Sequence, residues 1–461
     1  MITNLLTIKE FSITFFRKHT LLVLYLPILS LISVGLLYDS GADYILDFLI
    51  YCFFFIFSYF IFKKWFNRSF SQYNKFDFFL AIDELFSKRR LNYLAIIFVI
   101  LIIAFIIIHF IYIGHVPFIT ALHTHDYYDI SIIRQSLTDH DNIFINYISS
   151  FCVKGFIPFF LLYFYCNNKN IFWVFITISI FYSISLMQKG LIVSILIPLI
   201  IYNIFQPQFR FALLFSLIAV LGVFFLVFVT NPVLRTSKEK IEEKTKIELN
   251  INSSSQKIQE LPQELPQELP QELPQESPQE NFKKSTINNI KFLIETSRAA
   301  FNGIFSRVFI VPGKIVSIWF KYVPHRFPYS NGCGYRFLAP FLGCKYESYN
   351  YSRLIYDIEN PGDVAEGMKG TANVASFMND YSNFGWFGLV LAGMILAIFF
   401  NIIESLFANS FSWLITLNLL FILWLSSSAF YSTLFSGGWG ITLVLFFIFN
   451  KGLPVSSKSI L

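Results

Sequence analysis

The chain has 461 residues, of which 55% are hydrophobic, 19% are aromatic and only 14% are charged. Soluble globular proteins carry about 25% charged residues, so this composition excludes an ordinary soluble domain, whose surface needs more charge to stay hydrated. The net charge of +6 does not indicate nucleic-acid binding, because the cations gather at the ends of apolar blocks, as membrane orientation requires.

Apolar blocks follow one another along much of the chain, and at about 18–23 residues they are long enough to cross a hydrocarbon core of roughly 30 Å. The first block starts near Thr20. It is too long for the apolar part of a signal peptide and no cleavage site follows it, so we expect an uncleaved first helix. About ten membrane-spanning helices are predicted, at 20–37, 44–62, 91–113, 144–166, 171–187, 190–206, 211–230, 384–403, 409–426 and 433–450.

The charges of the connections orient these helices. The connection 63–90 carries seven Lys and Arg residues and is expected in the cytoplasm, whereas 115–142 carries one Arg and four Asp and is expected outside. Cations at Lys169, Arg210, Lys451 and Lys458 fit the same orientation. Both termini are then cytoplasmic, and residues 231–383 form one large loop on the outer side.

The chain divides into four parts: the first seven spans in 1–230, a spacer in 231–285, a loop subdomain in 286–383 and the last three spans in 384–461. The spacer contains a QELP repeat over 259–280. A proline at every fourth position forbids a continuous helix, and the segment has too little apolar surface to pack a core. We therefore expect a disordered spacer that carries no catalytic residue.

The loop subdomain begins with apolar residues at helical spacing, which Pro312-Gly313 interrupts. This pattern predicts short amphipathic helices that lie on the outer membrane surface or dip into it. Residues 323–383 are rich in Pro, Gly, Tyr and Asn, which indicates a compact irregular region above the membrane.

Two cysteines, Cys333 and Cys344, both fall in the large loop. If the loop faces an oxidising compartment they could form a disulfide; the alternative is two free thiols. Four histidines near aspartates in the first outer loop could bind a metal, but a solvated polar loop explains them better. We predict no metal and no other cofactor; these histidines are His115, His123, His125 and His140.

Cations at the expected outer face are the clearest chemical feature. An arginine binds phosphate oxygens with two parallel hydrogen bonds and keeps its charge, so several of them suit a lipid-linked pyrophosphate; salt bridges within the loop are the alternative. Lys154 lies inside the fourth span and Lys189 between two spans, where a functional role and snorkelling to the headgroups are equally favoured. The outer arginines are Arg134, Arg235, Arg298, Arg307, Arg326, Arg336 and Arg353.

The stretch GTANVASFMNDYSNFGWFGLVLAGMIL at 370–396 carries a Y-x-N-F-G-W-x-G turn that leads into an apolar helix. This stretch resembles the end of the large periplasmic loop in bacterial Wzy-type O-antigen polymerases, which join oligosaccharide repeat units. The segment SRVFIVPG at 306–313 is similar to the Arg-bearing surface helix of that family, with Arg307 as its arginine. The number of helices and the late large loop also match. One departure is that no outer arginine is followed by a glycine eleven positions later.

The resemblance implies a GT-C-like membrane fold and a metal-independent, inverting glycosyl transfer from an undecaprenyl-pyrophosphate-linked glycan. Arg307 and Arg298 are the catalytic candidates. On one straight helix they would point to opposite faces, and they could share a ligand only if the chain bends between them, for which Asn302-Gly303 is a suitable place; without that bend we prefer Arg307. His325 and Asp380 are candidates for the base. Other expected substrate contacts are Arg235, Arg326, Arg336, Lys154, Lys189, Tyr381 and Trp386; a membrane-interface position is the alternative for the two aromatic residues.

Three other functions remain open. An O-antigen ligase would use the same chemistry with lipid A–core as the acceptor. A flippase or other transporter should show two related halves, and no internal repeat of that kind is found. A non-enzymatic assembly protein would need no outer arginines. The expected partners are the lipid bilayer, the lipid-linked oligosaccharide and a chain-length regulator, and the expected location is the bacterial inner membrane with the large loop in the periplasm.

Overall fold

The computed structural model describes residues 14–72, 87–124, 126–136, 143–230, 305–408 and 410–454. Every regular element in these ranges is helical, and each of the ten predicted segments contains a helix. The helices of the first seven predicted spans are α2 (Thr20–Ser40), α3 (Ile45–Gln72), α5 (Lys88–Ile113), α8 (Ile143–Phe151), α9 (Ile157–Asn167), α10 (Lys169–Ser185), α11 (Lys189–Phe205) and α12 (Phe209–Thr230). Those near the C-terminus are α18 (Met378–Leu406), α19 (Phe411–Trp424), α20 (Phe430–Leu434) and α21 (Trp439–Phe449).

Within the described residues, seven helices or continuous helical runs have the length and apolar composition needed to cross a membrane. The other three predicted spans, α10, α11 and α19, are apolar helices of 17, 17 and 14 residues. The protein is therefore a polytopic, all-helical membrane protein.

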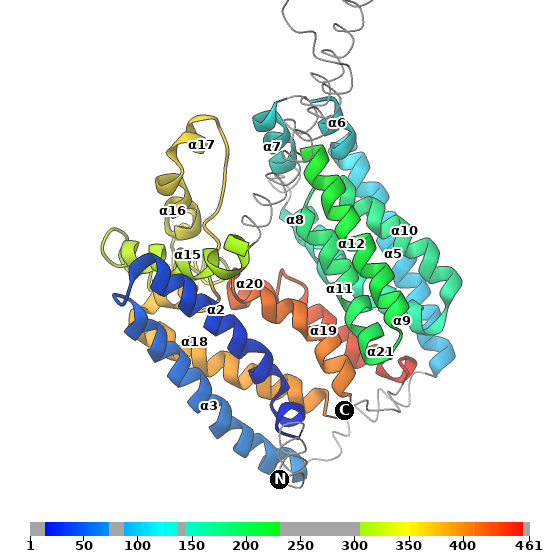
Figure 1. Ribbon diagram of the computed structural model, residues 1–461, viewed down its shortest axis with the longest axis horizontal. Helices are drawn as coiled ribbons and strands as arrows, with labels where there is room; N and C mark the ends of the chain where they lie inside the picture. Colours follow the sequence, from blue (N-terminus) through cyan, green and yellow to red (C-terminus); the bar gives the residue numbers. More distant parts are fainter. Residues whose placement is uncertain are drawn as a thin grey trace, which may run out of the picture.

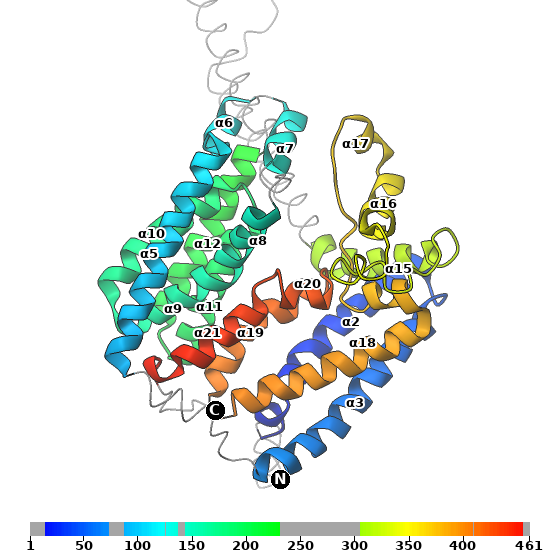
Figure 2. The same cartoon turned by 180° about the vertical axis from the view of Figure 1, so that it is seen from behind.

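The helices form two groups, which Figures 1 and 2 show side by side. In one group α18 packs along α3 and against α2. In the other, α11 packs on α12, α9 and α10, and α5 also contacts α9 and α10. Helix α19 contacts both α11 and α2, so it joins the two groups.

Five further helices lie at the upper ends of the two groups in Figure 1, α6 (Pro117–His123) and α7 (Tyr127–Ser136) on one group and α15 (Val311–Tyr322), with α16 (Tyr351–Glu359) and α17 (Pro361–Ala365) above it, on the other. The starts of α2 and α5 and the end of α21 lie at the opposite end in both views. We call the end that carries these five helices the loop end.

Helix α15 crosses α2 at a contact between Gly35 and Gly313. A Cβ atom on either glycine would overlap backbone atoms of the other helix, so only glycine allows this close approach. The apolar face of α15, with Val316, Trp319 and Phe320, is buried. The predicted amphipathic helix exists, but protein covers its apolar face.

The prediction that Pro312-Gly313 interrupts a helix was wrong. Pro312 lies in the first turn of α15, where its missing N–H costs nothing, because the first N–H groups of a helix have no partner inside it. Residues 305–309, which include Arg307, form a separate helical turn before it.

Helix α18 begins at Met378 rather than at the predicted 384, and its backbone is kinked at Gly385, with φ of 62°. The Y-x-N-F-G-W-x-G turn is this kink. Asn383 is fully buried there, and its Oδ1 accepts hydrogen bonds from Ser330 Oγ at 2.6 Å, Gly332 N at 3.0 Å and Gly334 N at 3.1 Å. The loop residues 330–334 are thereby held on the start of α18.

Candidate functional site

Three cations from different elements lie close enough for their charges to interact. The positive charges of Arg134 on α7 and of Arg307 on the turn before α15 both act on the ammonium group of Lys189. Lys189 is the first residue of α11, and the start of a helix already carries a partial positive charge. Like charges in one place are unfavourable, so an anion bound among them would be strongly attracted. We call Arg134, Lys189 and Arg307 the cation cluster.

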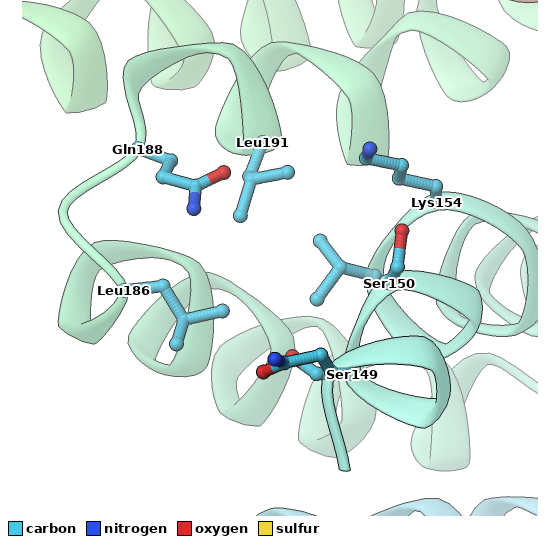
Figure 3. A pocket seen from close by; sticks show the side chains of 8 residues that line it. Ser149, Ser150, Lys154, Leu186, Gln188 and Leu191 are labelled. Carbon is cyan, nitrogen blue, oxygen red and sulfur yellow. The ribbon is translucent and has the colours of Figure 1, made fainter. Parts of the chain in front are cut away.

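A pocket of about 160 Å³ lies directly beside Lys189, because Gln188 is part of its lining. Lys154 and Ser150 enter it from the run α8–α9, and Gln188 and Leu191 enter it from the start of α11 (Figure 3). The complete lining is Asn146, Ser149, Ser150, Val153, Lys154, Leu186, Gln188 and Leu191.

Lys154 lies in a π-helical turn, Cys152–Phe156, between α8 and α9. Such turns carry one extra residue and recur at functional sites. The next residue, Gly155, packs on the turn before α21: a Cβ there would lie 3.2 Å from Gly438 O. The Nζ of Lys154 lies 5.4 Å from the centre of the Trp424 ring. Among the described residues, no ion pair is found for Lys154.

Hydrogen bonds fix the serines beside the pocket. Ser150 Oγ donates to Ser436 O at 2.7 Å. Ser149 Oγ lies 3.2 Å from the hydroxyl of Tyr182, which lies 2.7 Å from His109 Nδ1. These contacts join α5, α8, α10 and the turn before α21, so the lining is a rigid part of the second helix group.

Arg336 brings the late loop to α8. Its guanidinium carbon lies 6.0 Å from the ring centres of both Tyr147 and Tyr346, a geometry that suits cation–π attraction. Burial raises the pKa of Tyr346, and the charge of Arg336 opposes that rise. Tyr147 is next to Asn146 of the pocket lining, so Arg336 lies near the pocket.

Asp380, a candidate base, is buried with 4% of its surface exposed. Its Oδ1 accepts a hydrogen bond from the hydroxyl of Tyr335, and burial with this carboxyl raises the pKa of Tyr335 above its usual range. The pair ties the loop to the start of α18, which favours an anchoring role over a catalytic one.

His325 and Arg326 are exposed just after α15. The guanidinium carbon of Arg326 lies 5.8 Å from the ring centre of Tyr322. No contact of the described residues joins either side chain to the cation cluster. Arg298 and Arg235 lie outside the described residues.

The two aromatic candidates for sugar stacking differ in exposure: Tyr381 is buried, and Trp386 is exposed. The hydroxyl of Tyr381 donates to Val323 O at 3.2 Å, and its buried ring meets Phe320 edge-on at 4.7 Å. Trp386 Nε1 donates to Asp47 Oδ1 on α3, but 62% of the residue is exposed. The burial of Tyr381 favours helix packing over sugar binding, whereas the exposed ring of Trp386 fits the membrane-interface position that the sequence left open.

Cys333 and Cys344 form a disulfide, one of the two alternatives that the sequence left open. Among the described residues, no group of three His, Cys, Asp or Glu side chains is arranged to hold a metal ion. His125 and His140 lie outside this part of the chain.

One buried group escaped the sequence prediction. Glu404, near the end of α18, accepts hydrogen bonds from Lys63 Nζ at 2.6 Å, Tyr59 Oη at 2.6 Å and Leu21 N at 2.8 Å. It joins α2, α3 and α18 at the end opposite to the loop end. The predicted span stopped at residue 403, so this acid was assigned to a connection; a lone acid at the edge of an apolar block was the available signal.

Three comparisons with known proteins give no further guide: no protein-family model matches the chain, no curated protein matches it, and no solved structure matches its fold.

Proposed function

We propose that the protein is a glycosyltransferase that joins oligosaccharide repeat units carried on undecaprenyl pyrophosphate, as the resemblance to Wzy-type O-antigen polymerases implies. The observation that carries the proposal is the cation cluster. The late loop supplies Arg307, and the first seven spans supply Arg134 and Lys189. A site assembled from both parts of the chain suits a pyrophosphate, which offers several anionic oxygens at once.

In the proposed reaction the bond between C1 of the reducing-end sugar and the pyrophosphate oxygen breaks. The acceptor hydroxyl oxygen forms a new bond to C1 from the opposite face, and its proton passes to a base. The departing pyrophosphate gains negative charge, and cations placed where that charge develops lower the barrier. Arg307 would bind two oxygens in parallel, while Lys189 contributes a point charge at the start of α11.

We place the loop end in the periplasm of a bacterium and both termini in the cytoplasm, with ten spans in the inner membrane and a GT-C-like fold. The Lys- and Arg-rich connections support this orientation. The short helices at the loop end lie on the opposite side from the start of α2 and the end of α21. A disulfide between Cys333 and Cys344 suits an oxidising compartment. A chain-length regulator is the proposed protein partner.

The test replaces Arg307 by Lys, which keeps the charge and loses the paired hydrogen bonds. One charge-assisted hydrogen bond contributes about 1.5–3 kcal/mol, so we expect chain growth to slow by about tenfold or more at unchanged protein level. Arg353→Lys, an exposed arginine on α16, is the matched control and should make chains of normal length.

The readout is the length distribution of the surface polysaccharide in a strain whose own gene is deleted. The deletion strain should carry lipid A–core capped with single repeat units. Uncapped core in that strain would identify a ligase instead, and long chains in both the deletion strain and the Arg307→Lys strain would exclude either transferase.

A further inference from the structure

We infer that the pocket around Lys154 is a binding site for an anionic group, a phosphate or a carboxylate, separate from the cation cluster. The inference concerns binding alone and does not depend on glycosyl transfer.

The charge of Lys154 lacks a balancing anion within the described residues. Its side chain is largely buried, and burial without an anion is costly for an ammonium group. The ring of Trp424 at 5.4 Å offers a cation–π contact, which contributes about 0.5–2 kcal/mol and so offsets only part of that cost. No salt bridge to Lys154 is found in this part of the chain. A bound anionic ligand would balance the positive charge of Lys154.

The rest of the lining favours the same chemistry. Its polar side chains besides Lys154 are Asn146, Ser149, Ser150 and Gln188, and none of the eight lining residues is acidic. Gln188 is the N-cap residue of α11, and its side chain makes no capping hydrogen bond. Figure 3 shows its amide and the Lys154 side chain both bordering the open space. An amide N–H₂ and an ammonium group together offer several donors to one set of anionic oxygens.

The geometry of the site is built into the backbone. The π-helical turn changes the direction of the Lys154 side chain relative to a regular helix. Contact between Gly155 and Gly438 holds the turn, and Ser150 is bonded to Ser436 O. Because these contacts exist without a ligand, little ordering is required when one binds.

The lining also indicates how the site relates to the cation cluster. Gln188 lines the pocket, and its neighbour Lys189 belongs to the cluster. A ligand with two anionic groups could therefore occupy both places, whereas a single anion would bind in one of them.

The test measures binding to the full chain in nanodiscs of neutral phosphatidylcholine by calorimetry, with inorganic pyrophosphate and free glucuronate as separate probes. Lys154→Met removes the charge at similar length, and we expect it to weaken binding of one probe at least tenfold, while Lys154→Arg largely restores it. Lys169→Met is the matched control, since Lys169 also lies over a ring, that of Tyr165 at 3.3 Å; it should change neither affinity by more than about twofold.

The two probes distinguish the sources of the anion. A loss confined to pyrophosphate identifies a phosphate site, and a loss confined to glucuronate identifies a site for an acidic sugar. Gln188→Leu, which leaves Lys154 in place, should weaken the same probe several-fold and serves if Lys154→Met fails to fold. Equal affinities in the wild type, Lys154→Met and Gln188→Leu, or no binding of either probe to the wild type, would overturn the inference.

These outcomes are separate from those for the proposed function. In an Arg307→Lys background, Lys154→Met should still weaken binding of the same probe, even if Arg307→Lys stops chain growth. Normal chain growth in Arg307→Lys would remove the proposed role of Arg307 without affecting this site.

Discussion

Asn383 illustrates how one buried side chain positions the late loop. Its Oδ1 accepts three hydrogen bonds from residues 330–334, and its Nδ2 donates to Asn379 O at 2.7 Å. Two of the donors are backbone N–H groups, which an apolar residue at 383 would leave without this partner, buried at Gly332 and half-buried at Gly334. A backbone N–H left in that state costs about 1–3 kcal/mol.

We therefore predict that Asn383→Ala lowers the free energy of unfolding by about 3 kcal/mol or more, since it strands two such groups. The measurement is thermal unfolding of the detergent-solubilised protein. Asn360→Ala, which removes one side-chain bond to Tyr356 O, should cost about 1 kcal/mol. Equal losses in the two variants would contradict the role of Asn383.

Residue type and charge alone identified some residues of the candidate site, whereas the positions of others became clear only from the structure. Charge and residue type pointed to Lys154, Lys189 and Arg307, and in the structure the charge of Arg307 acts on Lys189. The role of Asn383 depends on partners about fifty positions earlier in the chain, a pairing that local pattern does not reveal. The sequence suggested that Tyr381 stacks on a sugar, but its side chain is buried in the structure.

The elements follow from apolar length, and their contacts follow from small residues. Ten blocks predicted ten helical segments because a run of apolar residues long enough to cross a membrane must satisfy its own backbone hydrogen bonds. The first residue of a helix was less predictable. Helix α18 begins at Met378, within polar sequence, because its first turn is buried against the loop. The crossing of α15 and α2 through Gly313 and Gly35 was not predicted. The residues beside each glycine in the sequence do not indicate that another helix approaches it.

We predict that Gly313→Val separates α15 from α2, because a Cβ there meets the backbone of Ile32 and Leu36. Overpacking of this kind costs about 1–3 kcal/mol or more, so the variant should unfold at lower temperature, and its residues 305–377 should be cut faster by protease. Gly362→Val is the control, since a Cβ on Gly362 meets nothing within 4 Å. Indistinguishable stability and cleavage of the two variants would show that this crossing is not tightly packed.

For the whole molecule, the proposed function depends on which side of the membrane each loop faces. Charge counts placed 115–142 and the late loop together outside, and α6, α7 and α15–α17 do lie at one end. The sequence could not supply the grouping of helices around α19, because contacts between distant apolar helices leave no periodic signal. The convergence of Arg134, Lys189 and Arg307 depends on that grouping.

We predict that a cysteine at 341 reacts with a membrane-impermeant maleimide in intact spheroplasts, because Phe341 is 87% exposed in the late loop. A cysteine at 169, an exposed position at the turn between α9 and α10, should react only after the membrane is permeabilised. Each replacement is made in a chain whose native cysteines are changed to alanine. Labelling of position 169 alone in intact spheroplasts would show the opposite orientation. Labelling of both positions would contradict the proposed orientation.

The most direct test of the central claim is transfer by the purified protein. The full chain in nanodiscs would be given undecaprenyl-pyrophosphate-linked repeat units of the host strain, with the products separated by mass. The account predicts lipid-linked products of two and more repeat units, free undecaprenyl pyrophosphate in matching amount, and at least about tenfold slower formation by Arg307→Lys. Unchanged single repeat units after incubation with the folded wild-type protein would contradict it.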